Sequence, residues 1–169
     1  SIIINNPLHL GPINKNYVAL PNIFTAAVKD ALIERINGIT PETQPKWGKM
    51  NAAQMLAHCN VTYEMAFEDK HKKAKGLKKW ILTKLVKNTV VSEKPYKHNS
   101  TTAPQFLVSA QQDFEQQKER LIHYLNETVN LGEQHFDGKE SNSFGNLSKA
   151  EWNNMFYKHL DHHLKQFGQ

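Results

Sequence analysis

Histidine is the residue type best placed to do chemistry in this chain of 169 residues, which holds nine histidines and one cysteine. Three of them, His159, His162 and His163, stand close together near the C-terminus. His159 and His163 are four residues apart, and on a helix this spacing brings their Cβ atoms to roughly 5–6 Å on one face. Two imidazoles so placed can bind the same metal ion. Alone, the pair is a weak signal, because it arises readily by chance in a histidine-rich chain.

The apolar residues around this pair predict which histidines face the protein interior. On a helical wheel, Trp152 and Phe156 belong to an apolar stripe, and His159 and His163 lie inside that stripe. His162 falls on its shoulder. We therefore predict that His162 does not share a site with the other two, although a set that uses His162 in place of His163 is geometrically feasible.

A histidine far upstream, His58, falls in the buried stripe of an earlier predicted helix, beside Met55 and Cys59. Buried imidazoles need polar partners, because an unpaired buried polar group costs free energy. One divalent metal ion would satisfy His58, His159 and His163 together; alternatively, each finds a carbonyl, a carboxylate or a water. An open site with three histidines would activate water or a substrate. Imidazole suits zinc, nickel, copper and iron alike.

The sequence indicates no general acid or base for such a site. Glu64 and Asp161 are close to the histidines along the chain, but their helical positions predict that they face away. His162 and His123 could carry protons, although a solvated or packing role is commoner for such residues. Cys59 could reach the site from its position beside His58, but a small buried thiol is the commoner role.

Hydrophobic spacing predicts the helices that would position these residues. They cover residues 23–37, 52–69, 104–129 and 149–167, with a shorter basic helix in 76–88. Asn51 is a predicted N-cap, and Ser148 with Glu151 forms a capping-box pattern. We expect an all-α four-helix bundle that forms a single domain over 1–169 and begins with an extended arm over 1–22. A small α+β fold stays open for the first 20 residues only.

The charge of the chain is concentrated in one segment. Residues 69–97 contain ten lysines and only two acidic residues, a net charge of +8 in a chain of +5, so the rest carries −3. This segment could be a solvated helix, a cover over a metal cleft that attracts an anionic substrate, or a contact for nucleic acid or membrane. The acidic remainder argues against general DNA binding.

Two observations bear on location. No stretch has the roughly 20 apolar residues of a membrane span, and the opening SIIINN lacks the preceding basic region of a signal peptide. The single cysteine rules out an internal disulfide. We expect a cytoplasmic protein.

Two stretches, WGKMNAAQMLAHCN (47–60) and FGNLSKAEWNNMFYKHLDHHLKQFG (144–168), resemble the DinB/YfiT-like superfamily of metal-binding four-helix bundles, and look closest to a branch without an established function. The resemblance implies that His58, His159 and His163 bind one divalent metal ion, which we expect to be zinc or nickel. It also implies a role for Gln166, since a glutamine recurs three residues after the last ligand in such helices.

The resemblance also implies a reaction class, because some relatives transfer low-molecular-weight thiols and others have been proposed as metal-dependent hydrolases. We therefore expect a metal-dependent hydrolase or thiol S-transferase that acts on an unknown small molecule. The alternative is a non-catalytic protein that binds a metal or another ligand. The expected partners are a small-molecule substrate or a thiol, and a homodimer is an option. We expect neither nucleic acid nor membrane as a partner.

Overall fold

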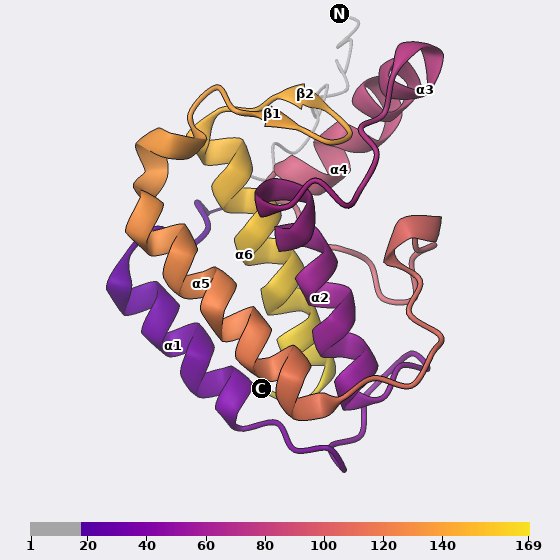
Figure 1. Ribbon diagram of the computed structural model, residues 1–169, viewed down its shortest axis with the longest axis vertical. Coiled ribbons are helices and arrows are strands. Elements are labelled where there is room, and N and C mark those ends of the chain that lie inside the picture. Colours follow the sequence, from indigo (N-terminus) through magenta and orange to yellow (C-terminus); the bar gives the residue numbers. More distant parts are fainter. Residues whose placement is uncertain (1–17) are drawn as a thin grey trace, which may run out of the picture.

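The computed structural model describes residues 18–169, which form a bundle of helices with one short hairpin (Figure 1). The predicted all-α bundle is confirmed. Its main helices are α1 (Ala26–Asn37), α2 (Ala52–Phe67), α5 (Phe114–Phe136) and α6 (Lys149–Gln166). Shorter elements are α3 (Gly76–Ile81), the π-helical turn η1 (Leu82–Val86), α4 (Lys87–Val91), the 3₁₀ turn η2 (Pro104–Phe106), and strands β1 (Glu140–Ser141) and β2 (Gly145–Asn146).

The two helices that carry the candidate ligands begin at capping boxes. The Asn51 side chain accepts the backbone N–H of Gln54, and the Gln54 side chain accepts the backbone N–H of Asn51. Ser148 and Glu151 exchange the same pair of hydrogen bonds at the start of α6. These boxes satisfy backbone donors that the first helical turn leaves free. The predicted starts of both helices are therefore confirmed.

Helix α2 packs along α5 on one side and along α6 on the other (Figure 1). The core between them is aromatic: the Tyr63 ring stacks on Phe156 with centroids 4.9 Å apart and on Tyr124 at 5.7 Å. Trp152 and Phe136 are fully buried beside them. Packing of this kind holds α2 and α6 in one register, which decides how the histidines on them meet.

The third predicted helix is wrong at both ends. It was expected over 104–129, but α5 begins at Phe114, where the Asp113 side chain caps it by accepting the N–H of Gln116 at 2.9 Å. Residues 107–113 are non-helical. The helix then continues past 129 to Phe136, bending at Gly132, whose φ of 73° is left-handed. The first helix likewise begins at Ala26 rather than at residue 23, because Thr25 caps it.

The hairpin between α5 and α6 was not predicted. Its strands are antiparallel, with Glu140 opposite Asn146 and Ser141 opposite Gly145. Of the predicted N-terminal arm, residues 18–22 have no regular secondary structure. The rest of the arm, with the α+β element left open there, lies outside the described residues. Within 18–169, no helix combines the length and apolar character needed to cross a membrane.

Candidate metal centre

The histidine cluster consists of His58 from α2 with His159 and His163 from α6. One ring nitrogen from each residue lies within 4.8 Å of the other two. The Nε2 atoms of His58 and His159 are 3.0 Å apart. His58 and His163 are buried, and His159 is half-buried. The structure thus brings the three predicted ligands to one place, and His159 is the least buried of them.

Hydrogen bonds outside the cluster determine which ring nitrogens carry a proton. The Nδ1–H of His58 donates to the backbone carbonyl of Phe106 at 2.8 Å, and the Nδ1–H of His163 donates to Gln166 Oε1 at 2.8 Å. Both acceptors are carbonyl oxygens, which cannot donate. In the neutral imidazoles the Nε2 atoms of His58 and His163 are therefore unprotonated, with lone pairs available to the cluster.

The loop that precedes α2 holds Gln166 in the required orientation. Gln166 Nε2 donates to the backbone carbonyl of Trp47 at 2.6 Å, so its Oε1 must face His163. Gly48 makes this approach feasible, because it has a φ of 81° and a Cβ there would lie only 2.6 Å from Gln166 Nε2. Glycine suits position 48 because it adopts a positive φ without strain and has no Cβ to contact Gln166.

His159 admits two hydrogen-bond arrangements. Its Nδ1 lies 3.1 Å from Thr62 Oγ1, and a hydroxyl can donate or accept. If Thr62 accepts, all three Nε2 lone pairs converge, and those of His58 and His159 repel at 3.0 Å unless a cation lies between them. If Thr62 donates, His159 Nε2–H can donate to His58 instead, and no metal is required for this pair.

The donor set fits a divalent ion. Zinc–nitrogen distances of about 2.0–2.1 Å in tetrahedral geometry place ligand nitrogens roughly 3.4 Å apart, which is within the spread of this cluster. Ligating histidines also typically donate their other ring N–H to a fixed acceptor, as His58 and His163 do here.

Burial keeps the three imidazoles neutral. It lowers the pKa of His58, although the Phe106 carbonyl opposes this, and it lowers the pKa of His163 to about 3 despite the opposing bond to Gln166. Burial and the neighbouring histidines lower the pKa of His159 well below its ordinary value. Neutral imidazole is the form that binds metal ions.

Aromatic side chains wall the cluster on the side of η2 and the long loop before it. The Phe106 ring lies 5.5 Å from His58 and 5.7 Å from His159, measured between centroids. The Tyr96 ring meets His159 edge-on at 6.5 Å. Neither residue was predicted, because the sequence gives no periodic pattern in this loop that would place it against α2 and α6.

His162 has its own surroundings at the rim of the cluster. Its ring lies 5.7 Å from Trp47 and 5.6 Å from Tyr96, and His98 lies 6.0 Å away. His98 in turn stacks on Trp47 at 3.8 Å. His162 is thus packed among aromatic rings, and its ring is not grouped with the three candidate ligands.

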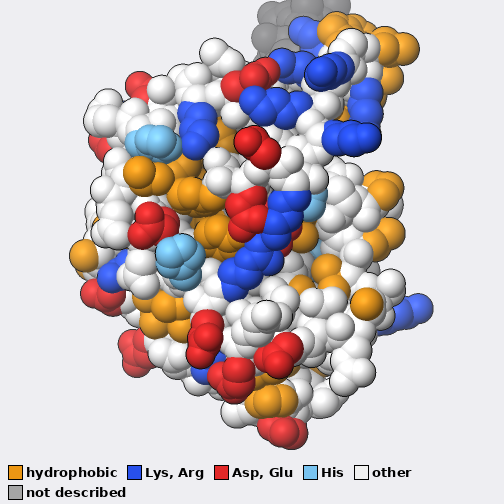
Figure 2. All heavy atoms as spheres, viewed as in Figure 1, with side chains coloured by type: hydrophobic (Ala, Val, Ile, Leu, Met, Phe, Trp, Pro, Cys, Tyr) orange, Lys and Arg blue, Asp and Glu red, His pale blue; other side chains and the backbone are white. Residues whose placement is uncertain are grey.

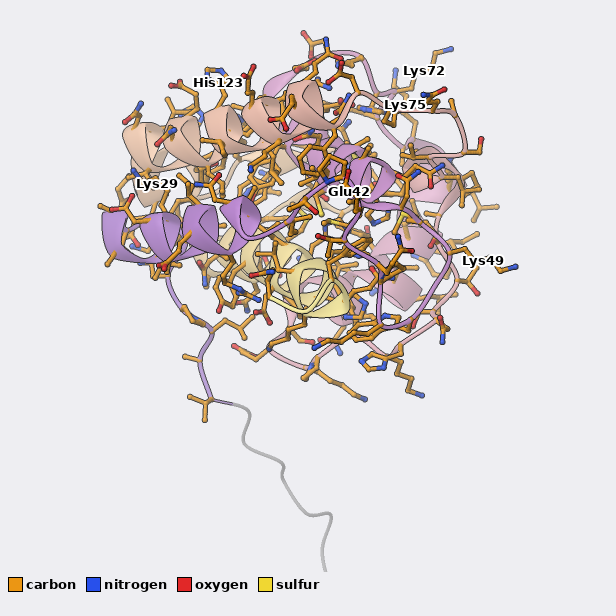
Figure 3. The ribbon with its side chains drawn as sticks, turned by 90° about the horizontal axis from the view of Figure 1, so that it is seen from below. Lys29, Glu42, Lys49, Lys72, Lys75 and His123 are labelled. Atoms are coloured by element: carbon orange, nitrogen blue, oxygen red, sulfur yellow. The ribbon has the colours of Figure 1, made fainter. Side chains whose placement is uncertain are left out.

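Two other candidates from the sequence lie away from the cluster. Cys59 is fully buried in the core, its sulfur 3.7 Å from that of Met55, and burial raises the pKa of its thiol far above the ordinary value. His123 is exposed on the outer side of α5 (Figure 3). Neither residue can supply a nucleophile or a proton to the cluster from these positions.

Both nearby carboxylates are paired elsewhere. Glu64 forms ion pairs with Lys70, His71 and Arg120. Asp161 accepts a hydrogen bond from Arg35 of α1 at 2.9 Å, and Lys165 is its second partner. The prediction that these two acids face away from the histidines agrees with those contacts.

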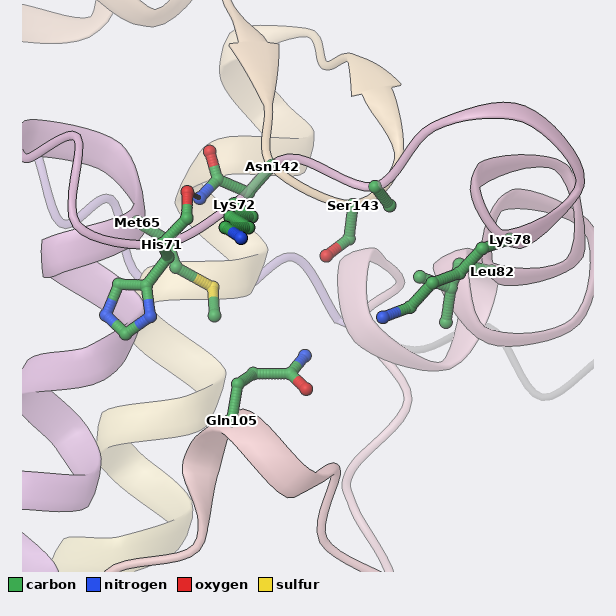
Figure 4. A pocket seen from close by; sticks show the side chains of 9 residues that line it. Met65, His71, Lys72, Lys78, Leu82, Gln105, Asn142 and Ser143 are labelled. Carbon is green, nitrogen blue, oxygen red and sulfur yellow. Dashed lines mark hydrogen bonds between the residues drawn. The ribbon is translucent and has the colours of Figure 1, made fainter.

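A pocket of about 200 Å³ lies between the end of α2, α3, η2 and the hairpin (Figure 4). Met65 lines it, seven residues after His58 on the same face of α2, which is roughly 10 Å along the helix. Gln105 also lines it, directly before the Phe106 whose carbonyl holds His58. Lys72 and Lys78 give it a positive rim. The pocket and the histidine cluster therefore have the η2 turn in common.

Fold and cluster together define a helical protein with a buried three-histidine cluster that could hold a metal ion. Residues 24–169 match the model of a family described as Protein of unknown function (DUF1569), and the chain belongs to that family. No curated protein and no solved structure matches the chain significantly.

Proposed function

We propose that the chain is a metal-dependent enzyme in which His58, His159 and His163 bind one divalent ion, zinc or nickel, through Nε2. The observation that carries the proposal is the outward hydrogen bonding of Nδ1: His58 and His163 each donate to a fixed carbonyl oxygen and turn a bare Nε2 toward the others. The likeness of 47–60 and 144–168 to the DinB/YfiT-like superfamily supports the same ligand set.

An ion held by three neutral imidazoles keeps its +2 charge and an open position, so it supplies Lewis acidity that lowers the pKa of a bound water or thiol. The protein's own residues provide the surroundings. Phe106 and Tyr96 limit the access of water, and His159 is the least buried of the three ligands. We place the rest of a small-molecule substrate in the pocket lined by Met65 and Gln105, because this pocket shares the η2 turn with the cluster.

Thiol S-transfer suits this site better than hydrolysis. No carboxylate belongs to the cluster within residues 18–169, so a carboxylate general base is not at hand. A thiol, with a pKa of about 8.5 against about 15.7 for water, needs far less help to lose its proton. The thiolate sulfur then forms a bond to the electrophilic carbon as the leaving group departs with its electron pair. Since Cys59 is buried in the core, the thiol must be a separate small molecule.

A non-catalytic binding protein is the second candidate. It is favoured by the arrangement in which Thr62 donates to His159 and His159 donates to His58, because that network needs no metal. In this case the cluster would anchor a polar ligand without turning it over.

Metal loading tests the site. After dialysis against zinc or nickel, mass spectrometry should find one ion per chain, and His58→Ala, His159→Ala and His163→Ala should each lose most of it. His162→Ala should keep the ion. The loaded wild-type protein should also unfold at a higher temperature, because an ion bound only by the folded state adds stability. A wild-type protein that binds no divalent ion rejects the proposal, and a site emptied by His162→Ala but not by His163→Ala rejects the ligand set.

Activity separates the two candidate functions. The metal-loaded protein is assayed with a panel of small thiols plus alkyl halides or epoxides, and with activated esters. Turnover of the thiol reactions that disappears in His58→Ala supports the transferase, and ester cleavage with the same dependence supports the hydrolase. Tight binding of a panel member without turnover identifies the binding protein.

A further inference from the structure

The helical segment of residues 76–91, formed by α3, η1 and α4, exposes its apolar side chains. Leu77 is 72%, Trp80 59% and Leu85 74% exposed, and Ile81 and Val86 are also exposed. The sequence predicted an amphipathic helix here, and the described part of the chain does not cover its apolar side. A group of large exposed apolar residues usually marks an interaction surface.

The segment is anchored to α6 at its α4 end and makes an ion pair to the hairpin from α3, through Lys79 and Glu140. At the α4 end, the buried Lys158 of α6 donates through Nζ to the carbonyls of Thr89 at 2.8 Å and Lys94 at 3.1 Å, and also to that of Ser92. Asn154 Nδ2 donates to the Val91 carbonyl at 2.9 Å. From this anchor, α3 projects beyond the bundle (Figure 1). Blue and orange side chains gather around it at the upper right of the molecule (Figure 2).

The lysines between residues 72 and 87 fall into two groups. Lys73 and Lys79 pair with Glu140 of the hairpin, and Lys87 pairs with Glu151 of α6. A second group makes no ion pair with any residue in 18–169 and is exposed: Lys72, Lys75, Lys78 and Lys84. Lys72 and Lys75 point outward from the edge of the molecule (Figure 3). Lys78 and Lys84 therefore stand among the exposed apolar residues of the segment, and Lys72 and Lys75 precede it.

We propose that residues 76–91 bind the surface of an anionic phospholipid membrane. The apolar side chains would enter the boundary between headgroups and acyl chains, as Leu and Trp of interfacial helices do, and the unpaired lysines would contact the phosphates. Trp80 suits this boundary because its ring is apolar and its N–H is polar. Nucleic acid would account for the lysines but would leave Leu77, Trp80 and Leu85 unexplained. The proposal replaces the expectation that no membrane is involved, and it is independent of the metal.

Vesicle co-sedimentation of the full chain tests the charge contribution. The protein should bind vesicles of phosphatidylcholine with phosphatidylglycerol, should not bind phosphatidylcholine alone, and should bind less at high salt. Each lysine near an anionic surface contributes a factor of about five. Changing Lys75, Lys78 and Lys84 together to Gln should therefore weaken binding roughly a hundredfold. A control with the same change of charge, in which Lys29, Lys49 and Lys118 away from the segment are changed to Gln, should bind nearly as the wild type does.

A second pair of variants tests insertion. Leu77→Ser with Leu85→Ser should lose at least about tenfold in binding, since apolar burial drives insertion, whereas Val18→Ser with Leu131→Ser, which alters exposed apolar residues elsewhere, should not. Trp80→Phe should still sediment with vesicles but should lose most of the blue shift in tryptophan emission. Circular dichroism confirms that each variant keeps its helices.

Several outcomes would overturn the proposal. One is wild-type protein that stays in the supernatant with anionic vesicles, as it would if the segment were covered in solution. Another is vesicle binding that the Leu77→Ser and Leu85→Ser changes leave intact. A third is tight binding to duplex DNA that depends on the three lysines while no insertion is detected, which would identify nucleic acid as the partner.

Discussion

Two polar clusters lie on different faces of α2, one made of neutral imidazoles and the other of paired charges. In the second, called here the acid–arginine cluster, Glu64 and Glu68 bind Arg120, and Lys70 and His71 complete the set. Every carboxylate in it has cationic partners within the protein. The histidine cluster contains no opposite charge within the described chain, and one ring nitrogen of each histidine lies within 4.8 Å of the other two.

This difference shows how structural and functional polar groups can be told apart. The acid–arginine cluster is complete as folded, so its role is to join α2 to α5 at the price of desolvation. The histidine cluster is arranged by partners outside it, Phe106 and Gln166, yet gains full satisfaction only from a cation or from one particular choice of protons. The predictions below separate the two clusters, beginning with the largest effect.

Acid should destabilise the metal-free protein over two overlapping pH windows that begin at different pH values. The histidine pKa values lie below 6.5 in the folded state, so unfolded chains bind protons first as the pH falls below 6.5. The contribution of these histidines to the free energy of unfolding is therefore fully present above pH 6.5. It is lost as the pH falls below 6.5, by up to about 1.4 kcal/mol per pH unit for each histidine. Burial raises the pKa of Glu68, but Lys70, Tyr124 and Arg120 outweigh this and hold it at about 2, so its contribution is lost only as the pH falls from 4.5 toward 2.

Urea unfolding of chelator-treated protein across this pH range measures both windows. His159→Gln with His163→Gln should flatten the slope just below pH 6.5, whereas Glu68→Gln should flatten only the slope below 4.5. The exposed His123→Gln is the control and should change neither. Equal slopes in the double histidine variant and the wild type would show that the cluster is not held neutral.

Arg120→Met should destabilise the fold without affecting metal loading. The change removes one of the three cationic partners of the buried Glu64 and leaves Lys70 and His71, so its cost should stay below the roughly 3 kcal/mol of a fully broken buried pair. Arg120→Lys should reduce the free energy of unfolding less, because lysine keeps the positive charge even though it lacks the guanidinium group that contacts both Glu64 and Glu68. Urea unfolding at neutral pH gives the cost, and metal analysis should still find wild-type loading. Loss of the ion in a folded Arg120→Met protein would mean that the two clusters are coupled.

Gln166→Ala should have the opposite effect to Arg120→Met: it should lower the metal affinity and leave the helix content almost unchanged. Without Gln166, the Nδ1–H of His163 loses its acceptor and the ring its orientation, and changes of this kind typically weaken metal binding about 10–100-fold. Competition with a zinc chelator measures the affinity. Asn130→Ala, which removes an exposed amide on α5, is the control. An unchanged affinity in Gln166→Ala would show that the ring is held by packing alone.

Much of the fold follows from local patterns in the sequence, and the exception is instructive. Asn51 and Ser148 mark helix starts because capping uses only residues within one turn. The start of α5 was missed because the apolar Phe106 imitates the spacing of a helical core residue. In the folded protein Phe106 instead packs against His58 and His159, a contact made across about 50 residues or more of chain that local spacing cannot indicate.

The candidate site divides in the same way. Helical periodicity alone placed His58, His159 and His163 on interior faces, and packing of α2 against α6 brings those faces together. The role of Gln166 came only from the family resemblance, and Thr62 was not predicted as a partner at all. Hydrogen-bond partners depend on side-chain directions within about 1 Å, which periodicity does not determine.

Thr62→Val gives the smallest effect and decides between the two proton arrangements of the cluster. Valine has nearly the shape of threonine but cannot hydrogen-bond His159 Nδ1, which lies 3.1 Å from the hydroxyl. If Thr62 accepts from His159 in the metal-bound protein, the change should weaken zinc about tenfold, the lower end of the range for such partners. Thr62→Ser keeps the hydroxyl and should stay close to wild-type affinity.

The metal-free protein should respond differently to the same change. If its network runs from the Thr62 hydroxyl to His159 and on to His58, Thr62→Val removes only the first of two bonds, a cost of about 1 kcal/mol in urea unfolding. NMR of the ring nitrogens would then find the His159 proton on Nε2 without metal and on Nδ1 with it. A proton on Nδ1 in both states would mean that the site is arranged for a cation before the cation arrives. We expect the first outcome, because the bare Nε2 of His58 lies 3.0 Å from His159 Nε2 and needs a donor there when no cation is present.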